Sequence, residues 1–120
     1  MKIMIVDDSV AMRMIVKKTL RQAGFAGHEI SEAEDGVRAL EAIRSGSPDL
    51  VLCDWNMPRM SGIELLEHLA AAGLKLIFGF VTSETTLEMR NRAANAGARF
   101  LIAKPFTPES FKAALSPHIH

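Results

Sequence analysis

The sequence has a single cysteine, no excess charge of either sign and no long apolar run. The lone Cys53 excludes an intramolecular disulfide and suits a reducing, cytoplasmic environment. Fourteen basic residues balance fourteen acidic ones, so no net electrostatic field attracts nucleic acid or an anionic membrane surface. The first apolar run is too short for a signal peptide, and none is long enough to span a membrane. We therefore expect a cytoplasmic protein that binds neither nucleic acid nor membranes.

What the sequence does contain is an alternation of short apolar segments with helical patterns. Apolar segments predict strands at 2–6, 49–54, 75–81 and 99–103, and the more polar segment 28–33 reads as a weak further strand. Apolar residues at three- and four-residue steps predict helices at 9–23, 36–44, 63–72, 86–96 and 108–115. Because strands separated by helices do not pair as hairpins, we expect an α/β fold in one domain over residues 1–120. It would be a doubly wound, five-stranded parallel sheet with five helices on both faces.

Polar side chains follow four of the five predicted strands, where ligand chemistry sits in parallel sheets of this kind. They are Asp7 and Asp8 after the first strand, Asp54 after the third, Thr82 and Ser83 after the fourth, and Lys104 after the fifth. Three carboxylates at one edge would repel one another by about 4 kcal/mol per pair at ~4 Å and an effective dielectric near 20. The sequence therefore predicts a cation among them, and an all-oxygen acidic pocket suits Mg2+.

The same edge has the components of a phosphoryl acceptor site. Asp54 would be the acceptor, Lys104 would supply an ammonium from across the cleft, and the Thr82 hydroxyl could donate to an incoming oxyanion. Taken singly, these residues have simpler explanations, since Asp8 or Ser9 could cap the first helix and a lysine can simply be exposed. Their joint occurrence at four strand ends favours a functional site.

The sequence resembles the receiver domains of two-component response regulators, and most closely the single-domain chemotaxis type. The similarity spans essentially the whole chain and includes "IMIVDDSVAMRMIV", "EAEDGVRALE", "CDWNMPRMSGIELL", "VTSE" and "AKPFTPESF". The resemblance implies a flavodoxin-like sheet with strand order 2-1-3-4-5.

The resemblance also implies a role for each matching residue. It makes Asp54 the phosphorylated residue, Asp7 and Asp8 the metal-binding pair, Asn56 the donor of a backbone carbonyl to the metal, Thr82 the switch hydroxyl and Lys104 the phosphate-binding lysine. It implies a cis bond between Lys104 and Pro105, and places Asn56 and Glu84 beside the path of the attacking water. The sequence departs from the family at Leu101, where an aromatic switch residue is usual. Because side chains alternate along a strand, Leu101 should face away from its neighbour Phe100.

The function that follows is a signalling switch rather than an enzyme. It would take a phosphoryl group from a sensor histidine kinase, a phosphotransfer protein or a small phosphodonor, and would then change its affinity for a target protein. An aspartyl-phosphate hydrolase is the alternative, but such enzymes generally need a second acid where Asn56 stands. A flavin carrier would need a phosphate-binding loop after the first strand, where "DDSVAM" would repel the phosphate.

Three local features of the sequence allow further expectations. Arg13 is expected on a solvated helix face, and Thr85 with Glu88 matches a capping box that would start the fourth helix. Gly79 interrupts the fourth strand, where it either weakens the strand or lets another segment approach closely.

Overall fold

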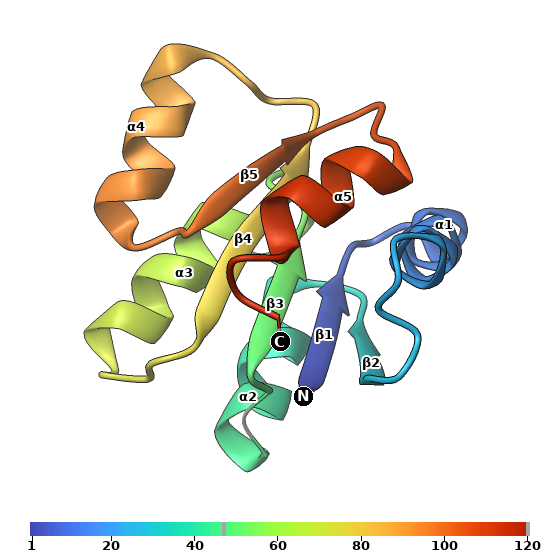
Figure 1. The fold of residues 1–120 in the computed structure, drawn as a ribbon. Coiled ribbons are helices and arrows are strands. Elements are labelled where there is room, and N and C mark those ends of the chain that lie inside the picture. The colour runs from blue at the N-terminus through green and yellow to red at the C-terminus, as the bar shows by residue number, and fades with distance from the viewer. Residues whose placement is uncertain (47, 120) are drawn as a thin grey trace.

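Strands and helices alternate along the chain in the computed structural model, which describes residues 1–46 and 48–119 (Figure 1). The strands are β1 (Lys2–Val6), β2 (Glu29–Ala33), β3 (Leu50–Cys53), β4 (Ile77–Thr82) and β5 (Phe100–Ala103). The helices are α1 (Val10–Gln22), α2 (Gly36–Ser45), α3 (Gly62–Ala71), α4 (Leu87–Ala96) and α5 (Pro108–Leu115). The predicted element order is confirmed. Among the described residues, no helix has the length and apolar character needed to cross a membrane.

All five strands are parallel and lie in the order β2-β1-β3-β4-β5. This confirms the doubly wound α/β class and the strand order implied by the family resemblance. The carboxyl ends of β1 and β3 are level, since Val6 pairs with Cys53. The ends of β4 and β5 are level too, since Thr82 pairs with Ala103. The residues that follow these strands are therefore brought to one edge of the sheet.

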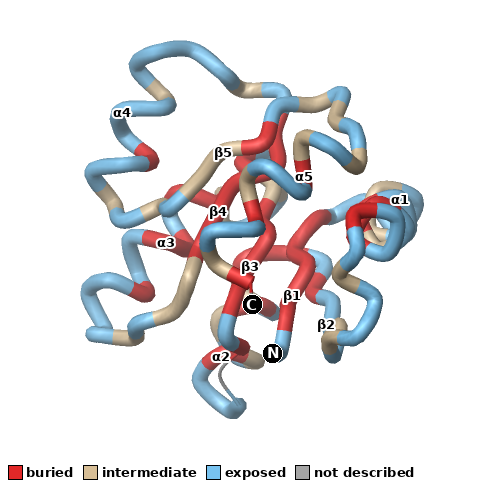
Figure 2. Tube along the Cα trace, viewed as in Figure 1, coloured by how far each residue is buried: buried red, intermediate tan, exposed pale blue. Residues whose placement is uncertain are grey.

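Alternation along the strands divides the core into two layers. Met4 and Val6 lie in the layer that α2, α3 and α4 cover, whereas Ile3 and Ile5 lie in the layer that α1 and α5 cover. Strands β1, β3 and β4 are buried on both faces, which explains why their sequences read as continuous apolar runs. Figure 2 shows the buried strands at the centre of the molecule, with exposed helix surfaces around them.

Helices α1, α2, α4 and α5 each begin at a cap residue whose side chain accepts a backbone N–H of the first turn, and one of these caps differs from the prediction. Ser9, Asp35 and Thr107 each cap a helix, the last with Pro108 at the first helical position. At α4, however, the cap is Thr86, whose hydroxyl accepts from the backbone N–H of Met89. The expected pairing of Thr85 with Glu88 is wrong, because the helix starts one residue later than that pairing needs.

Gly79 in β4 allows a close approach from the neighbouring strand. It pairs with Phe100 of β5, and a Cβ atom at residue 79 would overlap the Phe100 ring. Phe100 packs with the layer covered by α1 and α5, while Leu101 packs with the opposite layer. The expectation that these two side chains face opposite ways is confirmed, and so is close approach as the reason for the glycine.

Helix α4 is held less firmly than the other long helices. Ala93 is its only fully buried residue, and Leu87 at its first position is 74% exposed. Figure 2 shows this helix as a largely exposed segment at the rim of the molecule. A helix with so little buried surface can shift at small cost in packing energy.

Candidate functional site

The candidate site lies at the carboxyl edge of the sheet, where four strands deliver polar residues. Asp7 and Asp8 follow β1, and Asp54 follows β3. These strands are neighbours, and the carboxylates of the three residues each have an oxygen within 4.8 Å of the others. The structure thus brings together the three acidic residues that the sequence placed at this edge.

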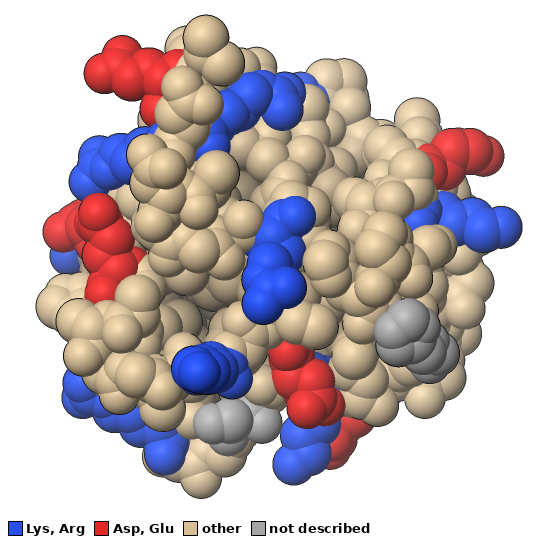
Figure 3. Space-filling model, turned by 60° about the vertical axis from the view of Figure 1, so that its left-hand side comes forward, with Lys and Arg blue, Asp and Glu red and all other residues tan. Residues whose placement is uncertain are grey.

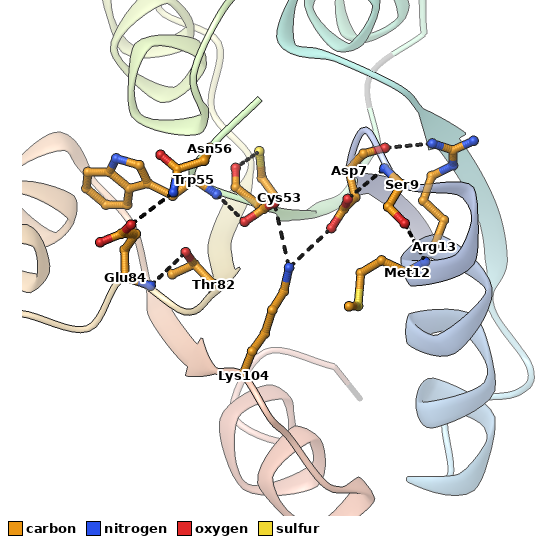
Figure 4. A network of polar contacts seen from close by, with 11 residues as sticks. Asp7, Ser9, Met12, Arg13, Cys53, Trp55, Asn56, Thr82, Glu84 and Lys104 are labelled. Atoms are coloured by element: carbon orange, nitrogen blue, oxygen red, sulfur yellow. Dashed lines mark hydrogen bonds and ion pairs between the residues drawn. The ribbon is translucent and has the colours of Figure 1, made fainter. Parts of the chain in front are cut away.

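Lys104 reaches into this acidic cluster from the end of β5. Its Nζ atom lies 3.5 Å from Oδ2 of Asp7 and 3.6 Å from Oδ2 of Asp54, so one ammonium bridges two carboxylates (Figure 4). Its backbone N–H donates to the Thr82 carbonyl, and the bond to Pro105 is cis. The lysine side chain is only 20% exposed, which strengthens its electrostatic effect on both acids.

Asp54 is half-buried, and its carboxylate has few compensating donors. Its Oδ1 atom accepts the Trp55 backbone N–H at 2.8 Å. Burial raises the pKa of Asp54, Lys104 opposes that rise, and the nearby charges of Asp7 and Asp8 add to it. One ammonium among three carboxylates therefore leaves excess negative charge at Asp54, which further positive charge would stabilise.

The backbone of Asp54 is fixed by its packing against the next helix. A Cβ atom at Gly62, the first residue of α3, would overlap the Asp54 carbonyl oxygen, so the helix start rests directly on the Asp54 peptide. The Asp54 N–H also donates to the Val6 carbonyl at 2.9 Å. These contacts hold the Asp54 carboxylate at a defined position relative to the acids after β1.

The turn after β1 is also held by hydrogen bonds. The backbone N–H of Ser9 donates to Asp7 Oδ1 at 2.9 Å, and the Arg13 guanidinium donates to the Asp7 carbonyl at 2.6 Å. The Arg13 side chain is 13% exposed, so the expectation that it lies on a solvated helix face is wrong. The periodicity of apolar residues could not predict this contact. An arginine can pack its aliphatic stem against apolar neighbours while its guanidinium binds a backbone carbonyl.

Thr82 and the loop beyond it form the other side of the site. Thr82 is fully buried, and its Oγ1 atom accepts the backbone N–H of Glu84 at 3.1 Å. The Glu84 carboxylate accepts the side-chain amide of Asn56, also at 3.1 Å. Asn56 is thus exposed on the β3–α3 loop and linked to the β4–α4 loop. Leu101 is not part of this cluster and pairs with Phe80 deeper in the sheet.

Cys53 lies next to Asp54 in sequence, but its thiol is buried and protonated. It is completely buried, and burial raises the pKa of its thiol well above the usual value, with Asp54 and Asp7 adding to the effect. Its Sγ atom donates to the Asp54 carbonyl at 3.1 Å. Cys53 therefore packs as a small hydrophobic side chain of the core.

The chemistry of these donors fits a small divalent cation. Carboxylate oxygens from Asp7, Asp8 and Asp54 converge. A site with only oxygen ligands suits Mg2+ rather than a softer metal. Asn56 lies two residues beyond Asp54, where its backbone carbonyl could complete such a set. Three negative charges against one ammonium provide the attraction for the cation.

Comparison with known proteins gives a consistent result. The response regulator receiver domain family matches residues 3–116. The chemotaxis protein CheY-3 of Vibrio cholerae is 45% identical over 117 residues, which cover 96% of this chain and 88% of that protein. The chemotaxis protein CheY of Pseudomonas aeruginosa is 44% identical over 114 residues, with 93% and 90% covered.

A solved structure agrees with the sequence matches. The chemotaxis protein CheY4 of Vibrio cholerae superposes with a TM-score of 0.85 at 31% identity, and 98% of each chain is covered. Further neighbours share the fold at lower identity, among them a receiver domain from Clostridium thermocellum with a TM-score of 0.83 at 24% identity. These likenesses support the fold described above.

Proposed function

The chain belongs to the response regulator receiver family, and on that premise we propose that it is a switch controlled by phosphorylation of Asp54. The observation that carries this proposal is the position of Lys104, whose Nζ atom lies within 3.6 Å of both Asp7 and Asp54. A lysine in this place offsets the charge of a phosphoryl group arriving at Asp54. Contact with two acids at once distinguishes Lys104 from a lysine in an ordinary surface ion pair, which contacts a single acid.

The transfer step uses the Asp54 carboxylate as the nucleophile. A carboxylate oxygen forms a bond to phosphorus, and the bond from phosphorus to the donor's imidazole nitrogen breaks, so the histidine leaves and takes up a proton. The product is an acyl phosphate. Later attack by water breaks the new bond between phosphorus and oxygen, which restores the carboxylate and releases inorganic phosphate. Acetyl phosphate can replace the histidine donor, with acetate as the leaving group.

The other residues position and neutralise the phosphoryl group. Lys104 pairs with a phosphoryl oxygen, and Thr82 turns its hydroxyl toward another, which releases the backbone N–H of Glu84. Asp7, Asp8, Asp54 and the Asn56 carbonyl would hold Mg2+. When bound, this ion neutralises charge on the phosphoryl oxygens during transfer.

The partners follow from the same chemistry. The donor is a sensor histidine kinase or a phosphotransfer protein, and the output is a change in affinity for a target protein. Both curated relatives are named chemotaxis proteins, which supports a chemotaxis pathway for this chain. On the face that Figure 3 presents, basic and acidic side chains are interspersed.

The experiment is labelling by acetyl phosphate in the presence of Mg2+, followed by intact mass spectrometry. We expect the parent to gain one phosphoryl group and Asp54→Asn to gain none. Asp49→Asn is the matched control, because Asp49 is an exposed carboxylate just before the opposite end of β3. Equal labelling of parent and Asp54→Asn would refute the proposal, and loss of labelling in Asp49→Asn would refute the assignment to this edge.

A further inference from the structure

Arg13 connects the acidic turn after β1 to strand β2. Its Nη1 atom donates to the Asp7 carbonyl at 2.6 Å, and its Nε atom donates to Oε1 of Glu32 at 3.0 Å. Figure 4 shows the guanidinium of Arg13 coming from α1 toward Asp7, opposite the side from which Lys104 approaches. The guanidinium of Arg13 is therefore held by two hydrogen bonds, one to Asp7 and one to Glu32.

The atom that Arg13 binds has a special position. The Asp7 carbonyl oxygen belongs to the peptide that joins Asp7 to Asp8, so fixing it fixes the plane from which both acidic residues extend. The Ser9 N–H holds the Asp7 side chain at 2.9 Å. The turn is thus held once through its peptide and once through a carboxylate.

Glu32 in turn is held in place for Arg13. Its second carboxylate oxygen accepts the Lys17 ammonium at 2.9 Å, which leaves the first oxygen directed at Arg13. The hydrogen bond from Lys17 is the main cause that lowers the pKa of Glu32, so this carboxylate stays ionised. A fixed, ionised acceptor on β2 sets the orientation of the guanidinium plane.

We propose that Arg13, oriented by Glu32, is a positioning residue for the divalent-cation site and sets the convergence of Asp7 and Asp8 with Asp54. This inference rests on the proposed function, because it assumes that the acidic cluster binds Mg2+. Arg13 touches neither the phosphoryl group nor the ion. It acts through the peptide between the two acids, as residues behind a metal ligand commonly do.

Electrostatics alone predicts a different result. A guanidinium near three carboxylates repels a cation, so its removal would tighten Mg2+ binding if only charge mattered. Removal of the Glu32 charge would weaken binding on the same ground. Positioning predicts that Arg13→Gln and Glu32→Gln both weaken binding, because each releases the Asp7 peptide. The sign of the Arg13→Gln effect therefore separates the two accounts.

The test is Mg2+ binding by calorimetry, which does not depend on phosphorylation. We expect Arg13→Gln and Glu32→Gln each to raise the Mg2+ Kd by about tenfold, the low end of the ~10- to 100-fold seen for residues behind a metal ligand. Arg13→Lys should recover part of the affinity, since an ammonium can reach one acceptor but not hold both. Lys18→Gln is the matched control, because it removes an exposed basic residue from the same helix without changing Arg13 or Glu32, and should change the Kd less than twofold.

A second readout separates positioning from a general loss of structure. At saturating Mg2+, acetyl phosphate should label Arg13→Gln at the parent rate, because the acceptor and Lys104 are intact. Parent-like or tighter Mg2+ binding by Arg13→Gln would overturn the inference while leaving the proposed function standing. A parent that binds no Mg2+ would overturn both. A labelling defect in Arg13→Gln that Mg2+ does not repair would overturn the positioning role.

Discussion

Leu101 and Thr82 lie on the same face of the sheet, on neighbouring strands. Thr82 pairs with Ala103, and Leu101 pairs with Phe80 two residues further from the carboxyl edge. Leu101 is partly buried in the layer that includes α4, on the side of Thr82 away from the acidic edge, so it lies toward the space that Thr82 would vacate. In the family, an aromatic ring at this position rotates between a buried and an exposed orientation. The aliphatic side chain of Leu101 has no ring to make that change.

We therefore predict that the switch depends on Thr82 and α4, with Leu101 moving little. Beryllofluoride, a mimic of the phosphoryl group, should shift the backbone amide NMR signals of α4 in the parent and in Leu101→Ala. The same shifts should be absent in Thr82→Ala, because no hydroxyl is drawn inward. Target affinity should change toward the low end of the ~1 to 3 kcal/mol usual for coupled sites. The opposite pattern, with loss in Leu101→Ala and retention in Thr82→Ala, would contradict this.

The hydrogen bond between Asn56 and Glu84 predicts where phosphate lifetime is controlled. The bond joins the loops after β3 and β4 beside Asp54, the proposed acceptor. The family resemblance places the path of the attacking water there. A bulky cation in Asn56→Arg would pair with Glu84 and cover that approach, so the acyl phosphate should decay more slowly than in the parent. Asn56→Ser leaves the approach open and serves as the control. Decay followed by intact mass after donor removal measures this, and equal decay rates in parent and Asn56→Arg would remove the basis for the prediction.

Mg2+ should stabilise the fold through the acidic cluster. At about 100 times its Kd, a ligand of the native state adds about 2.7 kcal/mol to the unfolding free energy. Asp8→Asn should lose most of that gain. Without Mg2+, the same variant should be more stable than the parent, because one of three crowded carboxylates is gone. Urea unfolding with and without Mg2+, followed by Trp55 fluorescence, measures both effects; a parent-like gain in Asp8→Asn would exclude Asp8 as a ligand.

Because Gly79 packs directly against the Phe100 ring, we predict that a larger residue at position 79 destabilises the fold. Gly79→Ala should lower the unfolding free energy by about 1–3 kcal/mol, since the new methyl group meets the ring. Combined with Phe100→Ala, it should cost less than the sum of the single changes, with a coupling of about 0.5–3 kcal/mol. Gly27→Ala, which meets no atom within 4 Å, should stay within about 0.5 kcal/mol of the parent. Additive costs in the double variant would contradict the packing account.

Local sequence signals predicted the helices, the strands and the polar carboxyl edge of the sheet. The strand order and the contacts between distant segments could not be read from those signals. The apolar runs and the polar residues that end them placed Asp7, Asp54 and Lys104 at one edge, since parallel strands share a direction. The strand order came only from family resemblance. The contact of Arg13 with Glu32 could not be predicted, because it depends on how α1 crosses β2.

The central claim is that Asp54 carries the phosphoryl group, and the most direct test is to locate the acyl phosphate chemically. Protein treated with acetyl phosphate and Mg2+ is reduced with borohydride, which converts a phosphorylated aspartate to homoserine, and is then sequenced by tandem mass spectrometry. We predict homoserine at position 54, with Asp7 and Asp8 unchanged. Homoserine at another aspartate, with position 54 intact, would contradict the account.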